Sequence, residues 1–270
     1  MELVDTHCHI QLIDDNTSDH TSALWQKDKN LSLQKVLESA KENGVNKMIV
    51  VGCTLRDSKL ALELADSRPD IYASIGIHPH EAEDFLRNKS ENYKNFENLI
   101  LTGNITAIGE CGLDYYYHHS NKSDQKTVLN FQLELATKYS LPVIFHVREG
   151  FEDFWKIVKN YPSIRGVLHS YTDSLDNLKI AQSLGFFIGI NGIATFTKDE
   201  TQLSMFKSVP LTNMLLETDS PYLTPIPLRG TINQPRNVRI ITKFVANLLN
   251  IREEEVATQT TLNATSLFNL

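Results

Sequence analysis

Eight short apolar segments alternate with longer amphipathic segments, and this alternation constrains the fold more than any other feature. Short apolar segments rich in β-branched residues are typical of strands that lie buried in a parallel sheet. The predicted strands are residues 3–9, 48–52, 72–78, 105–110, 142–147, 166–170, 186–190 and 214–218. Eight strands, each followed by a helix, predict an α/β fold of the (β/α)8 TIM-barrel type. The absence of a GxGxxG fingerprint disfavours a dinucleotide-binding sheet.

The intervening segments carry helix signals. Ser32 is a suitable N-cap, the apolar residues after it share one helical face, and Gly44 follows the end of the segment. The other predicted helices are residues 58–67, 92–100, 123–139, 151–159, 174–184, 199–208 and 235–250. An additional C-terminal helix over residues 253–268 is predicted to pack on the outside of the barrel.

The length suits one barrel, so we expect a single domain over residues 1–270. The polar stretch of residues 14–30 is predicted to be a long first loop between strand and helix, one that could cover a site or reshape access to it. No segment is apolar over the roughly 20 residues that a membrane span requires, and no secretory leader is recognisable. Three cysteines without a disulfide pattern favour a reducing compartment. We therefore expect a cytoplasmic protein that does not bind membranes, with a monomer as the default.

Two histidines alternate with a cysteine at the end of the first predicted strand. Since side chains alternate in a strand, His7 and His9 point to one side and Cys8 to the other. This spacing is typical of a metal-binding pair, although two hydrogen-bonded histidines inside a barrel are an alternative. Cys8 and Cys111, which both flank predicted ligands, are expected to be small buried residues rather than ligands.

Further residues that can bind a metal stand at or near the ends of four other predicted strands. They are Glu110, His146, His169 and Asp219. A barrel gathers the carboxyl ends of its strands at one face, where barrel enzymes place their active sites. We therefore expect these residues to converge with His7 and His9.

This ligand set is larger than one tetrahedral ion needs and suits two divalent ions bridged by a carboxylate, which we assign to Glu110. Mg, Mn and Zn all remain possible. Two such ions favour hydrolysis as the reaction. The net charge of −7 argues against broad electrostatic attraction to nucleic acid, but the ions would make the site locally positive.

Several motifs together resemble the TatD family of metal-dependent deoxyribonucleases, within the amidohydrolase-like barrels. The resemblance spans nearly the whole chain and rests on Asp5–His9, Gly76–His80, Gly109–Tyr115, Pro142–Arg148, His169 and Glu217–Leu223. It implies that His7, His9 and Asp219 hold one ion, that His146 and His169 hold the other, and that Glu110 is shared. It further implies DNA as a partner, cleaved from the 3' end of single strands.

Other candidate residues have a functional interpretation and a structural one. By analogy with amidohydrolase-like barrels, Asp219 is expected to act as general base, or else as a ligand only. His78 could bind a substrate phosphate, act as an acid or be merely structural. Arg148 could grip a phosphate or form a salt bridge. Asp114 and Tyr115 could support a metal-bound histidine and stack on a base, with loop packing as the alternative for Tyr115.

Two competing hypotheses remain at this stage. A hydrolase of a small ester, an amide or an aminoacyl ester would keep the ions and change the substrate. A non-catalytic binding protein would use the ions for stability alone, and it predicts closed coordination.

Overall fold

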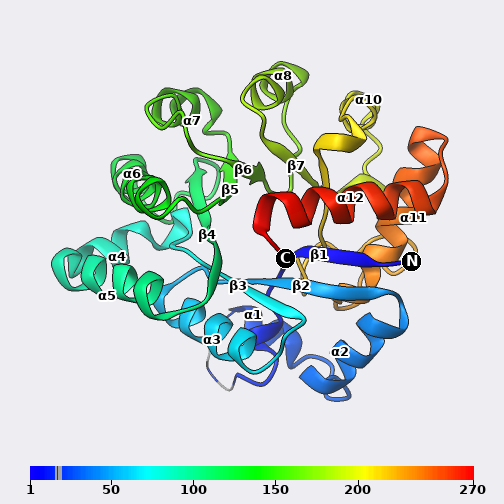
Figure 1. The fold of residues 1–270 in the computed structure, drawn as a ribbon, viewed down its shortest axis with the longest axis horizontal. Coiled ribbons are helices and arrows are strands. Elements are labelled where there is room, and N and C mark those ends of the chain that lie inside the picture. The colour runs from blue at the N-terminus through cyan, green and yellow to red at the C-terminus, as the bar shows by residue number, and fades with distance from the viewer. Residues whose placement is uncertain (16, 18–19) are drawn as a thin grey trace. The chain divides into compact units, whose positions relative to one another are not determined.

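The computed structural model describes residues 1–15, 17 and 20–270 (Figure 1). Its eight strands follow one another in the sheet in the order β1-β2-β3-β4-β5-β6-β7-β8. This order, with parallel pairing and a helix after each strand, confirms the predicted (β/α)8 barrel. By its internal contacts the chain divides into two compact units: residues 1–50 with 170–270, and residues 51–169.

The first unit carries the N- and C-terminal strands. Its strands are β1 (Leu3–Cys8), β2 (Val45–Val51, whose last residue is assigned to the other unit), β7 (Phe187–Ile190) and β8 (Met214–Leu216). β1 pairs in parallel with β2, β7 pairs with β8, and a bridge between Cys8 and Ser220 joins the end of β1 to the segment after β8. β1 is buried along its whole length, as a strand covered on both faces should be.

The helices of the first unit surround these strands. They are α1 (His20–Trp25), α2 (Leu33–Glu42), α8 (Leu175–Ser183), α9 (Ile193–Phe196), α10 (Glu200–Lys207), α11 (Val238–Leu249) and α12 (Glu253–Phe268). The extra C-terminal helix was predicted with the same limits as α12, and it contacts β1 and β8 (Figure 1). Ser32 caps α2 as predicted, because its hydroxyl accepts a hydrogen bond from the Lys35 amide.

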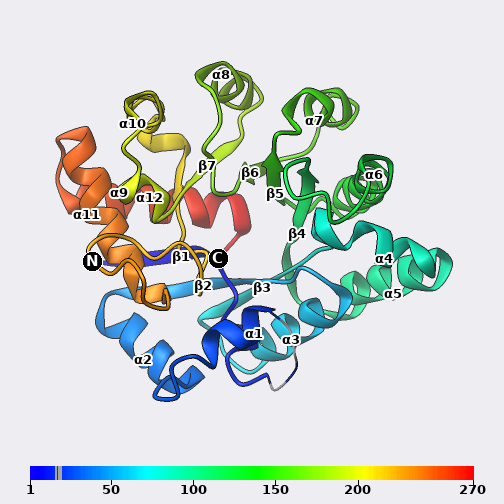
Figure 2. The same cartoon turned by 180° about the vertical axis from the view of Figure 1, so that it is seen from behind.

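The second unit contains strands β3 (Ile71–Ile75), β4 (Ile105–Asp114), β5 (Val143–Arg148) and β6 (Gly166–Leu168). Its helices are α3 (Leu55–Asp66), α4 (Ala82–Arg87), α5 (Lys89–Thr102), α6 (Lys122–Tyr139) and α7 (Phe151–Val158) (Figure 2). β4 is longer than predicted and continues past Glu110 to Asp114. The register of β4 with β5 places Gly112 opposite His146 and Asp114 opposite Arg148.

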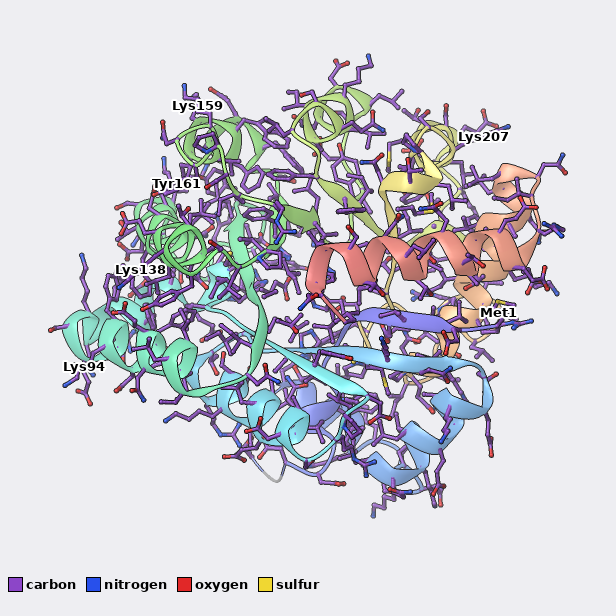
Figure 3. All side chains as sticks on the ribbon, viewed as in Figure 1. Met1, Lys94, Lys138, Lys159, Tyr161 and Lys207 are labelled. Atoms are coloured by element: carbon purple, nitrogen blue, oxygen red, sulfur yellow. The ribbon has the colours of Figure 1, made fainter. Side chains whose placement is uncertain are left out.

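Lysines on the outer helices project away from the strands, as Figure 3 shows for the labelled Lys94, Lys138 and Lys207. Such long charged side chains keep their ammonium groups in water.

Among the described residues, none of the helices combines the length and the apolar character needed to cross a bilayer.

The first loop differs from the prediction. Residues 14–30 were expected to lack regular structure, but α1 occupies His20–Trp25. The hydroxyl of Tyr222, in the segment after β8, lies 2.8 Å from the Thr21 hydroxyl and 3.2 Å from Nδ1 of His20. Contacts with Tyr222 therefore support a helix that its short polar sequence does not predict. Residues 16, 18 and 19 of the predicted loop lie outside the described residues.

Candidate metal centre

The first unit places two predicted ligands at the end of β1. His7 is fully buried and His9 nearly so. Cys8, between them, turns the other way, and its thiol lies 3.4 Å from the main-chain carbonyl of Ile49. The alternation of side chains along the strand therefore separates the imidazoles from the thiol, as predicted.

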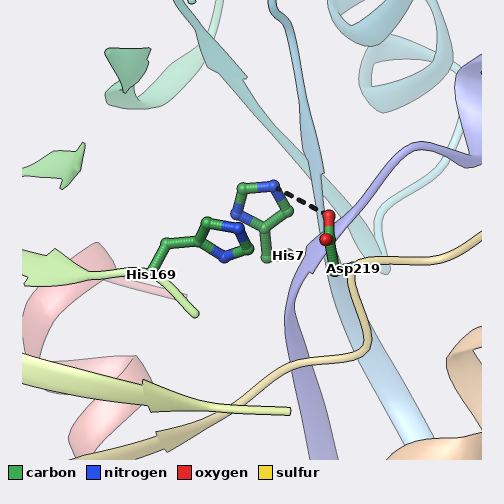
Figure 4. Close-up of side chains that lie close together, drawn as sticks. All are labelled: His7, His169 and Asp219. Carbon is green, nitrogen blue, oxygen red and sulfur yellow. Dashed lines mark ion pairs between the residues drawn. The ribbon is translucent and has the colours of Figure 1, made fainter. Parts of the chain in front are cut away.

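Asp219 joins these histidines because the chain after β8 bends back along β1. The amide of Asp219 donates to the carbonyl of His7 at 2.8 Å, and the amide of His9 donates to the carbonyl of Ser220 at 2.9 Å. Asp219 adopts a φ of 58°, a left-handed conformation that Asp tolerates better than most residues. Its Oδ1 lies 3.7 Å from Nε2 of His7 (Figure 4) and 3.4 Å from Nε2 of His9.

A buried hydrogen-bond network between Asp5 and Thr218 holds the main chain next to Asp219. The carboxyl group of Asp5 accepts the amide of Thr218 at 2.8 Å, and the hydroxyl of Thr218 is 2.5 Å from its other oxygen. Burial raises the pKa of Asp5 to about 8, although the hydrogen bonds from Thr218 oppose the shift. The raised pKa favours the protonated form of Asp5 in the folded chain, and the Thr218 hydroxyl donates to its Oδ2.

In the second unit, the carboxylate of Glu110 is surrounded by imidazoles. Its Oε1 lies 2.9 Å from Nδ1 of His146, 3.6 Å from Nε2 of His78 and 3.8 Å from Nε2 of His169. Glu110, His146 and His169 were predicted as ligands, and the structure brings them together. It adds His78, for which the sequence suggested a substrate or acid role. One carboxylate oxygen therefore faces three histidines from three different strand ends.

Residues between β2 and α3 help to hold this group. The carbonyl of Gly52 accepts the amide of Glu110 at 3.2 Å, and the carbonyl of Cys53 accepts the amide of His78 at 2.9 Å. The thiol of Cys53 also lies 3.6 Å from Oε2 of Glu110. Sequence analysis gave Cys53 no role, because no ligand pattern surrounds it.

Asp114 holds the far side of His146. Its Oδ2 lies 2.9 Å from Nε2 of His146 and 3.1 Å from Nε2 of His80. Burial opposes the charge on His146, but hydrogen bonds to Asp114 and Glu110 outweigh it and raise the pKa of this histidine to about 9. Burial likewise opposes the charge on Asp114, yet hydrogen bonds from His146 and His80 keep its pKa below its usual range.

Two buried glutamines on α6 form hydrogen bonds with the main chain beside Glu110 and its histidines. The side chain of Gln132 accepts the amide of Ile77 and donates to its carbonyl, at 2.8 and 3.1 Å. Gln125 makes the same pair of bonds to Asp114, both at 2.8 Å. Sequence analysis missed both glutamines, although their spacing places them on one face of a predicted helix. Buried amides of this kind fix the backbone that carries ligands.

The predicted substrate residues Arg148 and Tyr115 have different surroundings. Tyr115 is buried, and its hydroxyl donates to Asp153 at 2.8 Å, which supports loop packing. Arg148 is exposed, and its guanidinium carbon lies 3.8 Å from the ring centre of Tyr116. Within the described chain no carboxylate forms an ion pair with Arg148, so the salt-bridge alternative finds no support.

The donor chemistry of the second unit fits a divalent ion. One ligand atom each from His78, Glu110 and His146 lies within 4.8 Å of the other two. Neutral imidazole and carboxylate are common ligands of zinc and of other first-row metals. The Asp114 contact to His146 is the kind of carboxylate–histidine pair that orients a metal ligand.

A separate cavity of about 370 Å³ lies beside His80 and His119. Its wall contains the carboxylates of Glu81, Glu83 and Asp84, and the guanidinium of Arg87 in the same wall is paired with Glu83 and Asp84. Since this concentration of acid disfavours a phosphate group, we do not assign the cavity to an anionic substrate.

Comparison with known families gives these donor groups a context. Residues 4–269 match the model of the TatD-related DNase family. The chain belongs to the TatD family. The resemblance seen in the sequence motifs is thereby confirmed over nearly the entire chain.

Curated relatives of this TatD protein carry related names. An uncharacterized metal-dependent hydrolase of Buchnera aphidicola is 34% identical over 277 residues, covering 100% of this chain and 97% of that protein. A protein of Erwinia tasmaniensis named 3'-5' ssDNA/RNA exonuclease TatD is 36% identical over 258 residues, covering 93% of this chain and 97% of that protein. The TatD homologue YjjV of Escherichia coli has a crystal structure that matches with a TM-score of 0.85 at 26% identity, covering 99% and 98% of the two chains.

The chain is thus a TatD-family metal-dependent hydrolase, an enzyme that acts on ester bonds. The YjjV comparison also confirms the barrel fold. The prediction of a hydrolase that binds metal therefore holds, and this identity makes a purely structural role for the donor groups the weaker hypothesis.

Proposed function

We propose that this TatD protein hydrolyses phosphodiester bonds of DNA as an exonuclease acting from the 3' end of single strands. Two divalent ions, Mg, Mn or Zn, would be held by His7, His9, Glu110, His146, His169 and Asp219. The observation that carries the proposal is the carboxylate of Glu110, whose Oε1 has three imidazoles within 2.9 to 3.8 Å. A carboxylate with this many nitrogen donors around it suits a shared position between ions.

The proposed set of ligands draws on the general architecture of the fold. In a (β/α)8 barrel, residues at the carboxyl ends of different strands contribute to one site. The bound ions would supply Lewis acidity and lower the pKa of a water molecule, which is the chemistry that ester hydrolysis requires. The residues of the chain then have to orient the substrate and accept a proton.

Asp219 is the proposed proton acceptor. Its main chain is fixed to β1 by the hydrogen bond to His7, and its side chain is partly exposed at 15%, so it can reach a water molecule. His78 is less suited to act as an acid, because burial lowers its pKa well below the usual range and leaves it neutral. We assign His78 to contact with the substrate phosphate or to ligation.

Single-stranded DNA is the proposed partner for two reasons. The Erwinia relative with 36% identity carries a name that specifies exonuclease action on single-stranded DNA and RNA. Arg148, at the end of the strand that carries His146, provides an exposed guanidinium for a phosphodiester backbone. We place the protein in the cytoplasm, since Cys8, Cys53 and Cys111 are all free thiols, and we take the monomer as the default state.

The test compares wild type with Glu110→Gln on an end-labelled single-stranded oligonucleotide, with added magnesium, with manganese and with chelator. The substitution keeps the shape of Glu110 and removes its charge, so we expect at least about a hundredfold loss of rate. Wild type should yield a ladder shortening from the 3' end only when metal is present.

The matched control is Glu97→Gln, which removes a surface carboxylate that pairs with Lys138 on α6. Its activity should equal that of wild type. Equal activity of Glu110→Gln would refute the bridging role. If wild type leaves DNA intact with every metal but cleaves nitrophenyl esters, the small-ester hypothesis replaces the nuclease.

A further inference from the structure

Three consecutive tyrosines follow β4, and they differ in how much of each side chain is exposed. Tyr115 is buried, with 8% of its surface exposed, whereas Tyr116 and Tyr117 are exposed at 48% and 50%. Large aromatic rings are costly to leave in water, so a neighbouring pair of exposed rings calls for an explanation. Their position matters as well, because the strand that precedes them carries Glu110.

The two exposed rings are stacked with Arg148. The guanidinium carbon of Arg148 lies 3.8 Å from the ring centre of Tyr116 and 4.8 Å from that of Tyr117. The two tyrosine rings meet edge to face, with centres 4.8 Å apart. The ring of Tyr117 is nearly parallel to that of His119, at 5.9 Å. Planar groups therefore line the surface of this loop and offer π-faces next to a positive charge.

The loop is fixed before any ligand arrives. Oδ1 of Asp114 accepts the amides of Tyr116 and Tyr117, both at 3.0 Å. Gln125 clamps the main chain of Asp114, and the hydroxyl of Tyr115 is tied to Asp153. A rigid aromatic surface loses little conformational entropy when a flat ligand stacks on it.

The same residues connect this surface to the metal-binding group. Asp114 holds Tyr116 and Tyr117 with one oxygen and His146 with the other. Arg148 stands two residues after His146 on β5, opposite Asp114 in the register. A nucleotide whose base lies on the tyrosines would therefore have its backbone close to His146.

We propose that Tyr116, Tyr117 and Arg148 form a platform on which an unpaired nucleobase of the substrate strand stacks. The proposal rests on the proposed function, because the occupant is a base of the strand cleaved at Glu110 and His146. Stacking accepts every base, since each has a π-face, which suits an enzyme that degrades strands of any sequence. Paired bases are hidden in a duplex, so the platform selects single strands.

The test measures binding rather than cleavage. Metal-loaded protein is titrated into two fluorescein-labelled thymidine oligonucleotides with phosphorothioate linkages at the 3' end, which resist hydrolysis. One keeps all its bases, and the other has abasic residues at the 3'-terminal positions. Fluorescence anisotropy should show about tenfold tighter binding of the oligonucleotide with bases, as expected for one or two stacked bases.

The double variant Tyr116→Ala/Tyr117→Ala should bind both oligonucleotides equally, at the affinity of the abasic one. Tyr116→Phe/Tyr117→Phe keeps both rings and should restore the preference. Leu262→Ala, which removes another exposed apolar side chain, on α12, should leave the preference intact. Thermal unfolding checks that all variants keep the stability of wild type.

The platform is refuted if wild type binds the two oligonucleotides equally or binds neither, or if the alanine double variant keeps the preference. A preference for bases that depends on the tyrosines, in a protein that cleaves no DNA, would sustain the platform and refute the proposed nuclease instead. The two proposals can therefore fail separately.

Discussion

The two units hold their donor residues in different ways. In the first unit, the imidazoles of His7 and His9 stand 3.7 and 3.4 Å from Asp219 and share its carboxylate at ion-pair distance. In the second unit, both nitrogens of His146 lie 2.9 Å from carboxylates, one on Glu110 and one on Asp114. The donor residues of the first unit are positioned mainly by main-chain hydrogen bonds, whereas those of the second unit are joined directly by contacts between side chains.

The two arrangements prepare the donor residues for a positive ion in different ways. Asp219 is held through main-chain hydrogen bonds to β1, and its carboxylate lies at ion-pair distance from His7 and His9. The hydrogen bonds of His146 to Asp114 and Glu110 outweigh its burial and raise its pKa to about 9, which favours the protonated imidazole when no metal is bound. Binding of a metal ion by Glu110 and His146 should therefore release a proton. At low pH protons compete with the metal ion, so the affinity for the metal should fall.

The largest loss of stability should come from a substitution that displaces the backbone of His146. Gly112→Ala would place a Cβ 1.8 Å from the carbonyl oxygen of His146, at a φ of 154°. Because that neighbour is backbone, β4 and β5 would have to move apart, at a cost of about 4 kcal/mol or more. Denaturant unfolding measures the loss.

Gly189→Ala in the first unit is the matched comparison. Its Cβ would meet the carboxylate of Glu217 at 2.5 Å, and this buried side chain would have to shift against its hydrogen bond from the Ser170 amide, at a cost of about 1–3 kcal/mol. Equal losses for the two variants would mean that the backbone of His146 yields to a new Cβ as easily as the side chain of Glu217 does.

The next effect is a pH dependence of stability in the first unit. The pKa of Asp5 is about 8 in the folded chain and close to 3.8 when unfolded. Between these values the folded state keeps a proton that the unfolded chain releases, so stability falls as pH rises from about 4 to about 8. The loss should reach a few kcal/mol.

Asp5→Asn should remove this pH dependence, because its amide does not titrate and can donate to the Thr218 hydroxyl. That hydroxyl can then donate to Ser220, whose oxygen lies 3.0 Å away. Urea unfolding of both proteins at acidic and alkaline pH gives the comparison. A wild-type stability that stays level over this range would show that Asp5 is ionised in the folded state.

The smallest effect concerns the support of His146. Asp114→Asn keeps the oxygen that accepts the amides of Tyr116 and Tyr117 but removes the charge facing His146. Loss of such a partner typically weakens metal binding by about 10- to 100-fold. Calorimetric titration with manganese measures the affinity, and Asp153→Asn, beside Tyr115, is the control. An unchanged affinity would mean that Asp114 serves the loop alone.

The sequence predicted the parts of the fold that depend on local signals. Ser32 and the apolar face behind it fix α2, and α12 was predicted to the residue. α4 was missed because its short, charged sequence shows no clear periodicity, and α1 because its order comes from Tyr222. Local patterns describe long elements well, whereas short ones depend on distant contacts.

The candidate site was predictable to a similar extent. Donors at strand ends can be recognised from residue type and spacing, as for Glu110 and His146. The pairing of His146 with Asp114 follows from the register of β4 and β5, which no local pattern specifies. Gln125 remained hidden for a related reason, since it binds the main chain of Asp114 and a main-chain partner cannot be recognised from residue type.

The indole of Trp25 has a consequence for how cooperativity can be observed. Its Nε1 donates to the carbonyl of His9 at 3.1 Å, and the chain has 2 tryptophans, the other being Trp155 on α7. Each unit thus contains one tryptophan, which can be excited selectively. With Trp155 replaced by Phe, or Trp25 by Phe, emission reports one unit at a time. Coincident denaturation curves would mean that the halves melt as one body, whereas separate midpoints would reveal a half-folded intermediate.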